Sequence, residues 1–198
     1  MRLFLGILGL IALANCAGTV NAPAADIAAA RYQSSEPAYV SLMTMVNIEN
    51  DEGAHSAIIA NGSQVALYDP AGTYEHPTTP EVNDVFYGMT PRMIEVYEFF
   101  HARKTHYVVE QRVPVTREMA DAVIARMEAQ GPSGKMFCGI NTSEVLRDFP
   151  MFAHMPRSFY PDKLMAAMDK VPGVTTRRVY ESDTGKNISF APRKERNF

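Results

Sequence analysis

The sequence predicts an α+β domain, because apolar runs with strand character and apolar runs with helical periodicity alternate along the chain. Residues 39–48 and 107–113 are rich in β-branched and apolar side chains, as strands are. Residues 90–103 and 116–130 have apolar side chains at helical spacing, and each range begins with a threonine that suits the N-cap position. Helices and antiparallel strands in this order fit an α+β domain with a central antiparallel sheet packed against helices.

A β-hairpin is the clearest local signal. Residues 55–60 and 63–69 are strand-like, and Asn61-Gly62 lies between them. Asn-Gly is typical of two-residue hairpin turns, because both residues tolerate positive φ. In that register His55 pairs with Tyr68, so we expect Asp69 within one residue of His55.

The other elements follow from turn residues and apolar spacing. Residues 50–53 read as a turn, and residues 75–83, with two prolines, as a loop. A third helix is expected to open at Asn141 or Thr142, with the hydroxyls of Thr142 and Ser143 as caps, and to end before Pro150. The sequence closes with a fourth helix over residues 161–170 and a last strand over residues 174–180.

Residues 1–16 have the features of an export signal. A positive charge precedes the uncharged apolar run of residues 3–13, which is shorter than the roughly 20 residues of a permanent transmembrane helix and suits a signal peptide. Leu13-Ala14-Asn15-Cys16 resembles the lipobox of bacterial lipoproteins, although Asn15 replaces the usual small residue. The resemblance implies lipidation of Cys16 and a periplasmic protein anchored by its lipid to the outer or the inner membrane. The outer membrane is expected, because Ala17 and not aspartate follows Cys16. A signal peptide cleaved near Asn21-Ala22 is the alternative.

Composition sets the remaining boundaries. Residues 17–37 are rich in alanine and small polar residues and are expected to form a flexible tether, residues 38–181 a single domain, and residues 182–198 a basic polar tail. The chain is 46% apolar and 21% charged with a net charge of -3, which is ordinary for a globular protein and excludes a nucleic-acid-binding class.

Cys138 is the first candidate for chemistry. If Cys16 is lipidated, Cys138 has no partner for a disulfide within the chain. A thiol near a helix start is favoured as thiolate by the helix dipole and free N–H groups. A buried structural thiol, or a disulfide with Cys16, remains the alternative.

His55 and Asp69 are the candidates for a base and the group that orients it. Asp69 can hold the imidazole so that its other nitrogen faces Cys138. The alternatives are a hydrogen-bonded histidine at a strand end and an aspartate that forms a turn before Pro70.

No cofactor and no metal are expected. His101 and His106 are five residues apart and lack the spacing of zinc ligands. Together with His76 and His154 they are interpreted as surface or capping histidines, with His106 as a distant alternative base.

The histidine hairpin and the cysteine at a helix start resemble the NlpC-type papain-like cysteine peptidases. Here His55 precedes Cys138 by more than eighty positions, which resembles the circularly permuted branch of that superfamily. The resemblance implies a papain-like fold with Cys138 as nucleophile, His55 as base and Asp69 as orienting group. Gly139 departs from the bulky or polar residue more familiar after the nucleophile.

This resemblance implies an envelope cysteine hydrolase that acts on a peptidoglycan peptide, another amide or a lipid ester. The alternatives are a thiol-dependent acyltransferase and a non-catalytic lipoprotein that binds a partner or polymer.

Overall fold

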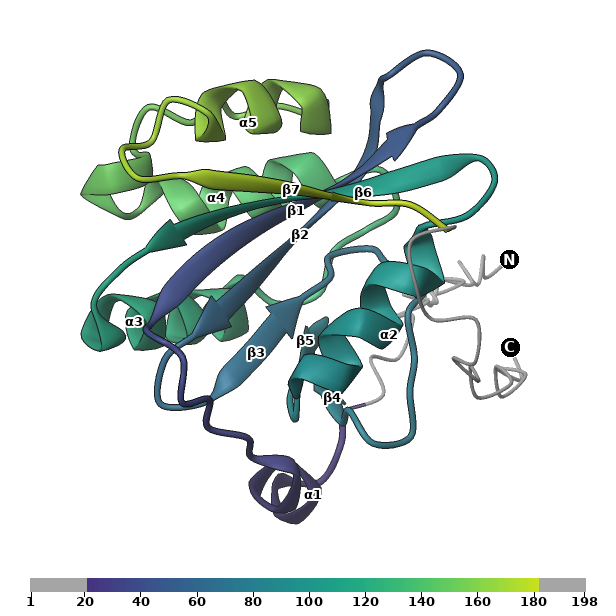
Figure 1. Cartoon of the computed structure of the whole chain (residues 1–198). Helices are drawn as coiled ribbons and strands as arrows, with labels where there is room; N and C mark the ends of the chain where they lie inside the picture. The colour runs from purple at the N-terminus through teal and green to yellow at the C-terminus, as the bar shows by residue number, and fades with distance from the viewer. Residues whose placement is uncertain (1–20, 182–198) are drawn as a thin grey trace, which may run out of the picture.

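The computed structural model describes residues 21–181, and in this range the chain is a mixed α+β domain built on one seven-stranded antiparallel sheet (Figure 1). The leader with Cys16 and the tail of residues 182–198 lie outside the described residues. The elements in chain order are α1 (Ala24–Ala30), β1 (Tyr39–Asn47), β2 (Gly53–Asn61), β3 (Val65–Tyr68), β4 (Glu81–Val82), β5 (Val85–Phe86), α2 (Pro91–His101), β6 (His106–Pro114), α3 (Arg117–Gln130), α4 (Cys138–Arg147), a 3-10 helix (Pro150–Phe152), α5 (Pro161–Met168) and β7 (Thr175–Val179).

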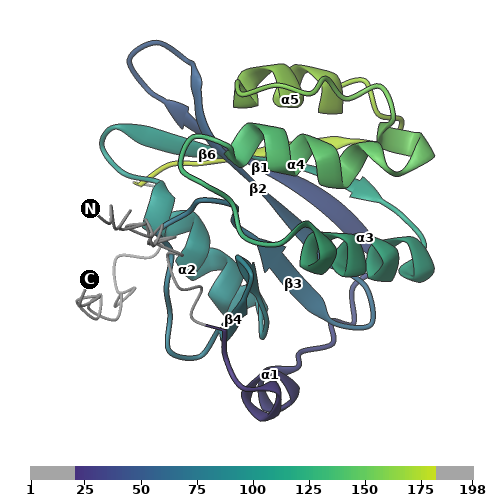
Figure 2. The same ribbon diagram turned by 180° about the vertical axis from the view of Figure 1, so that it is seen from behind.

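The sheet has the order β4-β5-β3-β2-β1-β6-β7 and separates two apolar cores. Alternate residues of β2 point to opposite faces, as the two-residue period of a strand requires. Ile58 packs with residues of α3, α4 and α5, whereas Ile59 packs with residues of α2. Figure 2 shows α3, α4 and α5 together on one face of the sheet.

Threonine caps start two of the helices as the sequence predicts. The Thr90 side chain accepts a hydrogen bond from the backbone of Met93 at the start of α2, and Thr116 does the same for Met119 at the start of α3. Each cap satisfies one backbone N–H that has no partner within its helix.

The two-residue turn predicted for the hairpin is wrong. Asn61 belongs to β2 and pairs with Val65, so residues 62–64 form the loop. Because Tyr68 pairs with Ile58 and not with His55, the register is shifted by three residues from the prediction. The loop is held by α3: Asp121 accepts a hydrogen bond from the Ser63 backbone at 2.6 Å. This tertiary contact overrides the local preference of Asn-Gly.

Two further segments differ from expectation, and the predicted tether holds a short helix. Residues 81–86, predicted as part of a loop and its flank, form the short hairpin of β4 and β5, whose turn residues Asn83 and Asp84 both have positive φ. The predicted tether contains α1, and the backbone N–H of Ala22 donates to the carbonyl of Glu81. The third helix, α4, begins at Cys138 and so includes Thr142, which was expected at its cap.

Candidate active site

The site forms where one edge of β2 is left uncovered. β3 pairs with only the second half of β2, residues 58–61, whereas β1 pairs with β2 along its length. β3 ends at Tyr68 because Pro70 has no backbone N–H and Ala71 takes a positive φ of 61°. The first half of β2, which carries His55 and Ser56, therefore has no strand on this side.

The first turns of α4 cover this edge. The Thr142 hydroxyl donates to the backbone carbonyl of Ser56 at 3.3 Å, and the Ser56 hydroxyl donates to Thr142 Oγ1 at 3.2 Å. The backbone N–H of Ser56 hydrogen-bonds the Cys138 thiol. Both peptide groups of Ser56 that β3 would otherwise bind are thus satisfied by α4, as buried backbone groups require. Thr142 is a buried anchor and not the predicted cap.

His55 and Asp69 lie in direct contact, as the sequence predicts. His55 Nε2 is 2.6 Å from Asp69 Oδ1, and the Asp69 side chain is fully buried while that of His55 is 17% exposed. The Tyr97 hydroxyl of α2 donates to the same Oδ1 at 2.9 Å. Asp69 also forms a turn, because its backbone carbonyl accepts from the N–H of Gly72. The turn-forming and histidine-orienting roles therefore belong to different parts of the same residue.

Gly72 leaves the space that the carboxylate fills. A Cβ at this position would lie 1.8 Å from Asp69 Oδ2, so any larger residue would displace the Asp69 side chain. Oδ2 is buried and has no hydrogen-bond partner. An unpartnered carboxylate oxygen is costly to bury, and the nearby positive charge of a protonated His55 is the natural compensation.

Electrostatics favour a protonated His55. Burial alone would lower the pKa of its imidazole, but the charge and hydrogen bond of Asp69, with a smaller contribution from Cys138, raise it to about 10. Burial alone would raise the pKa of Asp69, yet the charge of His55 and the hydroxyl of Tyr97 hold it below its ordinary value. The pair is therefore an ion pair at neutral pH.

The same surroundings favour the thiolate of Cys138, which is a free thiol with 7% of its surface exposed. Burial raises the pKa of the thiol. The hydrogen bond and charge of His55, and the backbone N–H groups of Ser56 and Gly139, outweigh burial and bring the pKa below its ordinary value. Since Asp69 occupies Nε2 of His55, Nδ1 is the ring nitrogen left for the thiol. The structure thus brings all three predicted residues together.

Two residues of α2 were missed by sequence reasoning. Tyr97, treated as part of an apolar stripe, holds Asp69. His101, interpreted as a surface or capping residue, stacks on His55 with ring centroids 5.7 Å apart, and its Nε2 is buried without a hydrogen-bond partner. Burial lowers the pKa of His101 to about 4, so it faces His55 as a neutral ring. One turn of helix separates the two residues, and this spacing was the available signal.

The side chains of the remaining histidines hydrogen-bond groups outside this arrangement. His76 contacts Thr78, His106 contacts Thr105, and His154 bonds the carbonyl of Ala167. Within residues 21–181 no group of three or more histidine, cysteine or acidic side chains is placed to hold a metal ion.

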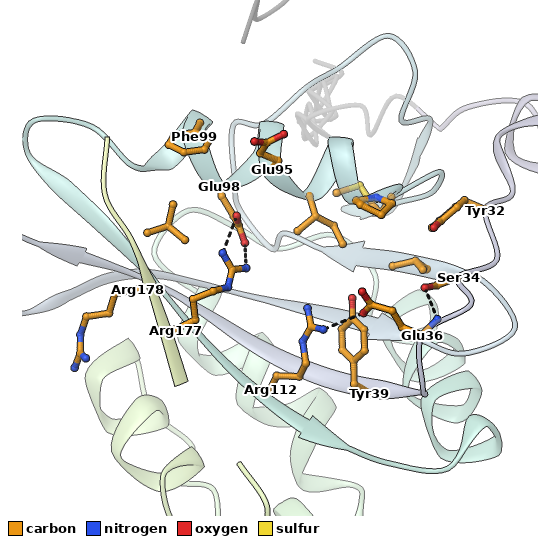
Figure 3. Close-up of a pocket in the computed structure, with 15 residues that line it drawn as sticks. Tyr32, Ser34, Glu36, Tyr39, Glu95, Glu98, Phe99, Arg112, Arg177 and Arg178 are labelled. Carbon is orange, nitrogen blue, oxygen red and sulfur yellow. Dashed lines mark hydrogen bonds and ion pairs between the residues drawn. The ribbon is translucent and has the colours of Figure 1, made fainter. Parts of the chain in front are cut away.

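A separate pocket of about 350 Å3 lies between α2 and the β6–β7 edge (Figure 3). Its lining includes Arg177, which pairs with the buried Glu98 (Figure 3), and Arg112, which lies over the ring of Tyr39 at 3.8 Å. Behind the lining, Arg177 also binds the buried Glu110. Its lining contains neither a cysteine nor a histidine. Because Arg177 holds the two buried acids together, we assign this pocket to a structural ion-pair network.

No protein-family model, curated protein or solved structure matches this chain. None of the helices within residues 21–181 is long and apolar enough to cross a membrane.

Proposed function

We propose that this chain is a cysteine hydrolase with Cys138 as nucleophile, His55 as base and Asp69 as the group that orients His55. One observation carries the proposal: a buried carboxylate lies 2.6 Å from Nε2 of a histidine whose imidazole also hydrogen-bonds a free thiol at a helix start. A nucleophile, its base and an orienting group in this order are what acyl transfer to a thiol requires.

The reaction proceeds in two halves. The Cys138 thiolate attacks the carbonyl carbon of an ester or amide, and the carbonyl π electrons move to oxygen. The tetrahedral intermediate collapses to a thioester as the protonated His55 gives its proton to the leaving alcohol or amine. In the second half, water gives a proton to His55 as its oxygen attacks the thioester carbon. The C–S bond then breaks, which releases the acid and restores the protonated His55 and the Cys138 thiolate.

Backbone N–H groups support the oxyanion of each intermediate. The N–H groups of the first turn of a helix have no partner within the helix and lie at its positive end. At the start of α4, the N–H of Gly139 and the N–H of Ser56 already reach the Cys138 thiol. Donors at this place are positioned for charge that develops on a carbonyl attacked by that thiol.

We propose that the chain belongs to the circularly permuted NlpC-type papain-like peptidases. Two features support this family: His55 precedes Cys138 in the sequence, and the helix that begins at Cys138 packs against an antiparallel sheet. We also propose that the protein is exported and lipid-anchored through Cys16 in the bacterial cell envelope. The proposed anchor rests on the sequence pattern of residues 1–16, and labelling with radioactive palmitate, compared with a Cys16→Ala variant, tests it.

Thiol reactivity tests the catalytic proposal. Iodoacetamide should alkylate Cys138 in the full chain at a pH well below the ordinary thiol value of about 8.5. His55→Ala should slow alkylation at pH 6 at least about 10-fold, since the imidazolium is the main group that lowers the thiol pKa. Cys16→Ala in both proteins removes the second thiol, and Cys138→Ser gives the background.

His154→Ala is the matched control, because His154 bonds a carbonyl of α5 away from the thiol. It should alkylate at the wild-type rate. Alkylation of Cys138 with an ordinary thiol titration, unchanged by His55→Ala, would exclude the hydrolase and leave a lipoprotein that binds a partner or polymer.

A further inference from the structure

Large apolar side chains gather on the surface at the start of α4. Six large hydrophobic residues in the described range are exposed. Four of them flank the site: Met136 and Phe137 directly precede Cys138, and Phe159 and Tyr160 lie in the loop before α5. We call Met136, Phe137, Phe159 and Tyr160 the apolar rim.

Two contacts hold the two halves of the rim together. The rings of Phe137 and Phe159 meet edge to face with centroids 5.2 Å apart. A Cβ on Gly139 would lie 2.6 Å from the backbone oxygen of Ser158 and 3.0 Å from that of Phe159. The loop before α5 therefore rests directly on the residue after Cys138, and Gly139 is required because a larger side chain would push this loop away.

Met136 is exposed in an unfavourable conformation. Its φ is +70°, which is rare for a residue with a long side chain, and 82% of its surface is exposed. Strained residues of this kind are found at functional sites and ligand clamps. Core packing cannot explain Met136, because its side chain contributes nothing to either apolar core.

We propose that the apolar rim binds the acyl chain of the substrate, so that the substrate is a fatty acyl ester of a lipid. This inference rests on the proposed function. The acyl group is the part of the substrate that stays bonded to Cys138 after the leaving group departs, and the rim begins at the adjacent residue. Exposed apolar side chains grouped in this way mark a surface that is covered by an apolar ligand or partner, and thioether and aromatic side chains adapt to flexible chains.

The chemistry adds no group that the proposal for Cys138 does not contain. The thiolate forms a thioester with the fatty acyl carbonyl, and the alcohol of the lipid leaves with a proton from His55. Water then releases the fatty acid. The rim is a specificity surface for the acyl group and takes no part in proton transfer.

The test compares p-nitrophenyl acetate, butyrate and octanoate, each below its critical micelle concentration, with the full chain. The octanoyl ester should have a kcat/KM at least about 10-fold above that of the acetyl ester, since each methylene placed against apolar side chains favours binding. Phe159→Ser should reduce this ratio to about 2-fold or less, and Phe159→Leu should restore most of it. Thermal unfolding checks that both variants fold.

Tyr180→Ser is the matched control. Tyr180 is also exposed, at 40%, but it stacks on Tyr107 beyond the end of β7, which β1 and β6 separate from β2. It should leave the octanoyl-to-acetyl ratio unchanged. Equal kcat/KM values for all chain lengths, with turnover that depends on Cys138, would overturn the role of the rim and leave the hydrolase standing. The absence of any Cys138-dependent turnover would overturn both.

A second arm identifies the acyl donor. Two substrates are tested in separate assays. One is phosphatidylethanolamine in mixed micelles with detergent, and the other is a dipeptide N-acylated with the same fatty acid. Fatty acid release from the phospholipid is expected. Release from the acyl peptide alone, or from neither, would overturn the assignment to a lipid ester.

Discussion

Asp69→Asn tests whether a buried charge, and not only packing, keeps His55 protonated. The substitution retains the shape of the side chain and an oxygen that can accept from Tyr97, but it removes the negative charge 2.6 Å from Nε2. A hydrogen bond to a charged group contributes about 1.5–3 kcal/mol, and 1.36 kcal/mol corresponds to one pKa unit. The pKa of His55, about 10 in the wild type, should therefore fall by about one to two units.

NMR titration of histidine-labelled protein measures this change directly, and His55→Ala assigns the signal. Since the pKa of His55 lies above its unfolded value of about 6.5, Asp69 contributes stability that is full below pH 6.5 and is lost as the pH rises toward 10. Asp69→Asn should thus cost about 1.5–3 kcal/mol of unfolding free energy at pH 6 and less at pH 10.

Tyr97→Phe separates charge from hydrogen bonding. It removes the other hydrogen bond to the same carboxylate oxygen and keeps the charge. This variant should lose about 1 kcal/mol of stability, while the pKa of His55 stays at or above the wild-type value. A wild-type His55 that titrates near 6.5, or a pKa that does not change in Asp69→Asn, would refute the reasoning.

Three other substitutions probe the surroundings of the site. His101→Phe should remove an acid-dependent loss of stability. The pKa of His101 is lowered to about 4, so the wild type should lose up to about 3 kcal/mol of unfolding free energy as the pH falls from 6.5 toward 4. Urea unfolding at pH 7 and pH 5 measures this loss, and equal losses in the wild type and the variant would contradict the prediction. Gly139→Ala should lower the free energy of unfolding by about 1–3 kcal/mol, since the new Cβ would meet the backbone oxygen of Ser158 at 2.6 Å. An unchanged thermal midpoint would show that the loop before α5 moves freely. Thr142→Val should cost about 1–3 kcal/mol in urea unfolding and slow alkylation of the thiol, because Ser56 loses both of its hydrogen bonds to Thr142. Wild-type values for both measurements would argue against α4 as the cover of this edge.

Local signals in the sequence are sufficient for the helices and the long strands. The caps at Thr90 and Thr116 and the strands β1 and β6 lie within a residue or two of their predicted bounds. Each of these elements has its own apolar period or cap, so that neighbouring elements are not needed to recognise it. The short hairpin of β4 and β5 also had a local signal, since Asn83 and Asp84 suit a turn with two positive φ values.

The contact between His55 and Asp69 was predicted for a reason that the structure does not support. In the predicted register His55 lies opposite Tyr68, which would place Asp69 on the other face of the sheet. The observed register pairs Tyr68 with Ile58, so Asp69 comes opposite Ala57 and shares a face with His55. The odd shift of three residues is set by the contact of the loop with Asp121, which no local pattern contains.

Tyr97 and His101 could not be assigned from the sequence, because an aromatic stripe on a helix usually packs in a core. Both do pack on the β2 face that carries Ile59. Only the place where α2 crosses the sheet decides that the Tyr97 hydroxyl meets Asp69 and that the His101 ring stacks on the ring of His55. The polar atoms of these two aromatic side chains therefore belong to the site, although the apolar pattern of α2 predicts only core packing.

The end of β3 connects the fold to the proposed chemistry. If β3 continued for two more residues, its backbone would bind the peptide groups of Ser56, and α4 could not reach this edge. Pro70 prevents that continuation, since it offers no N–H to the ladder. The N–H of Ser56 is then available to the Cys138 thiol, and its carbonyl to Thr142. The same interruption directs Asp69 toward His55, so one proline that ends a strand provides both a donor for the thiol and a carboxylate for the base.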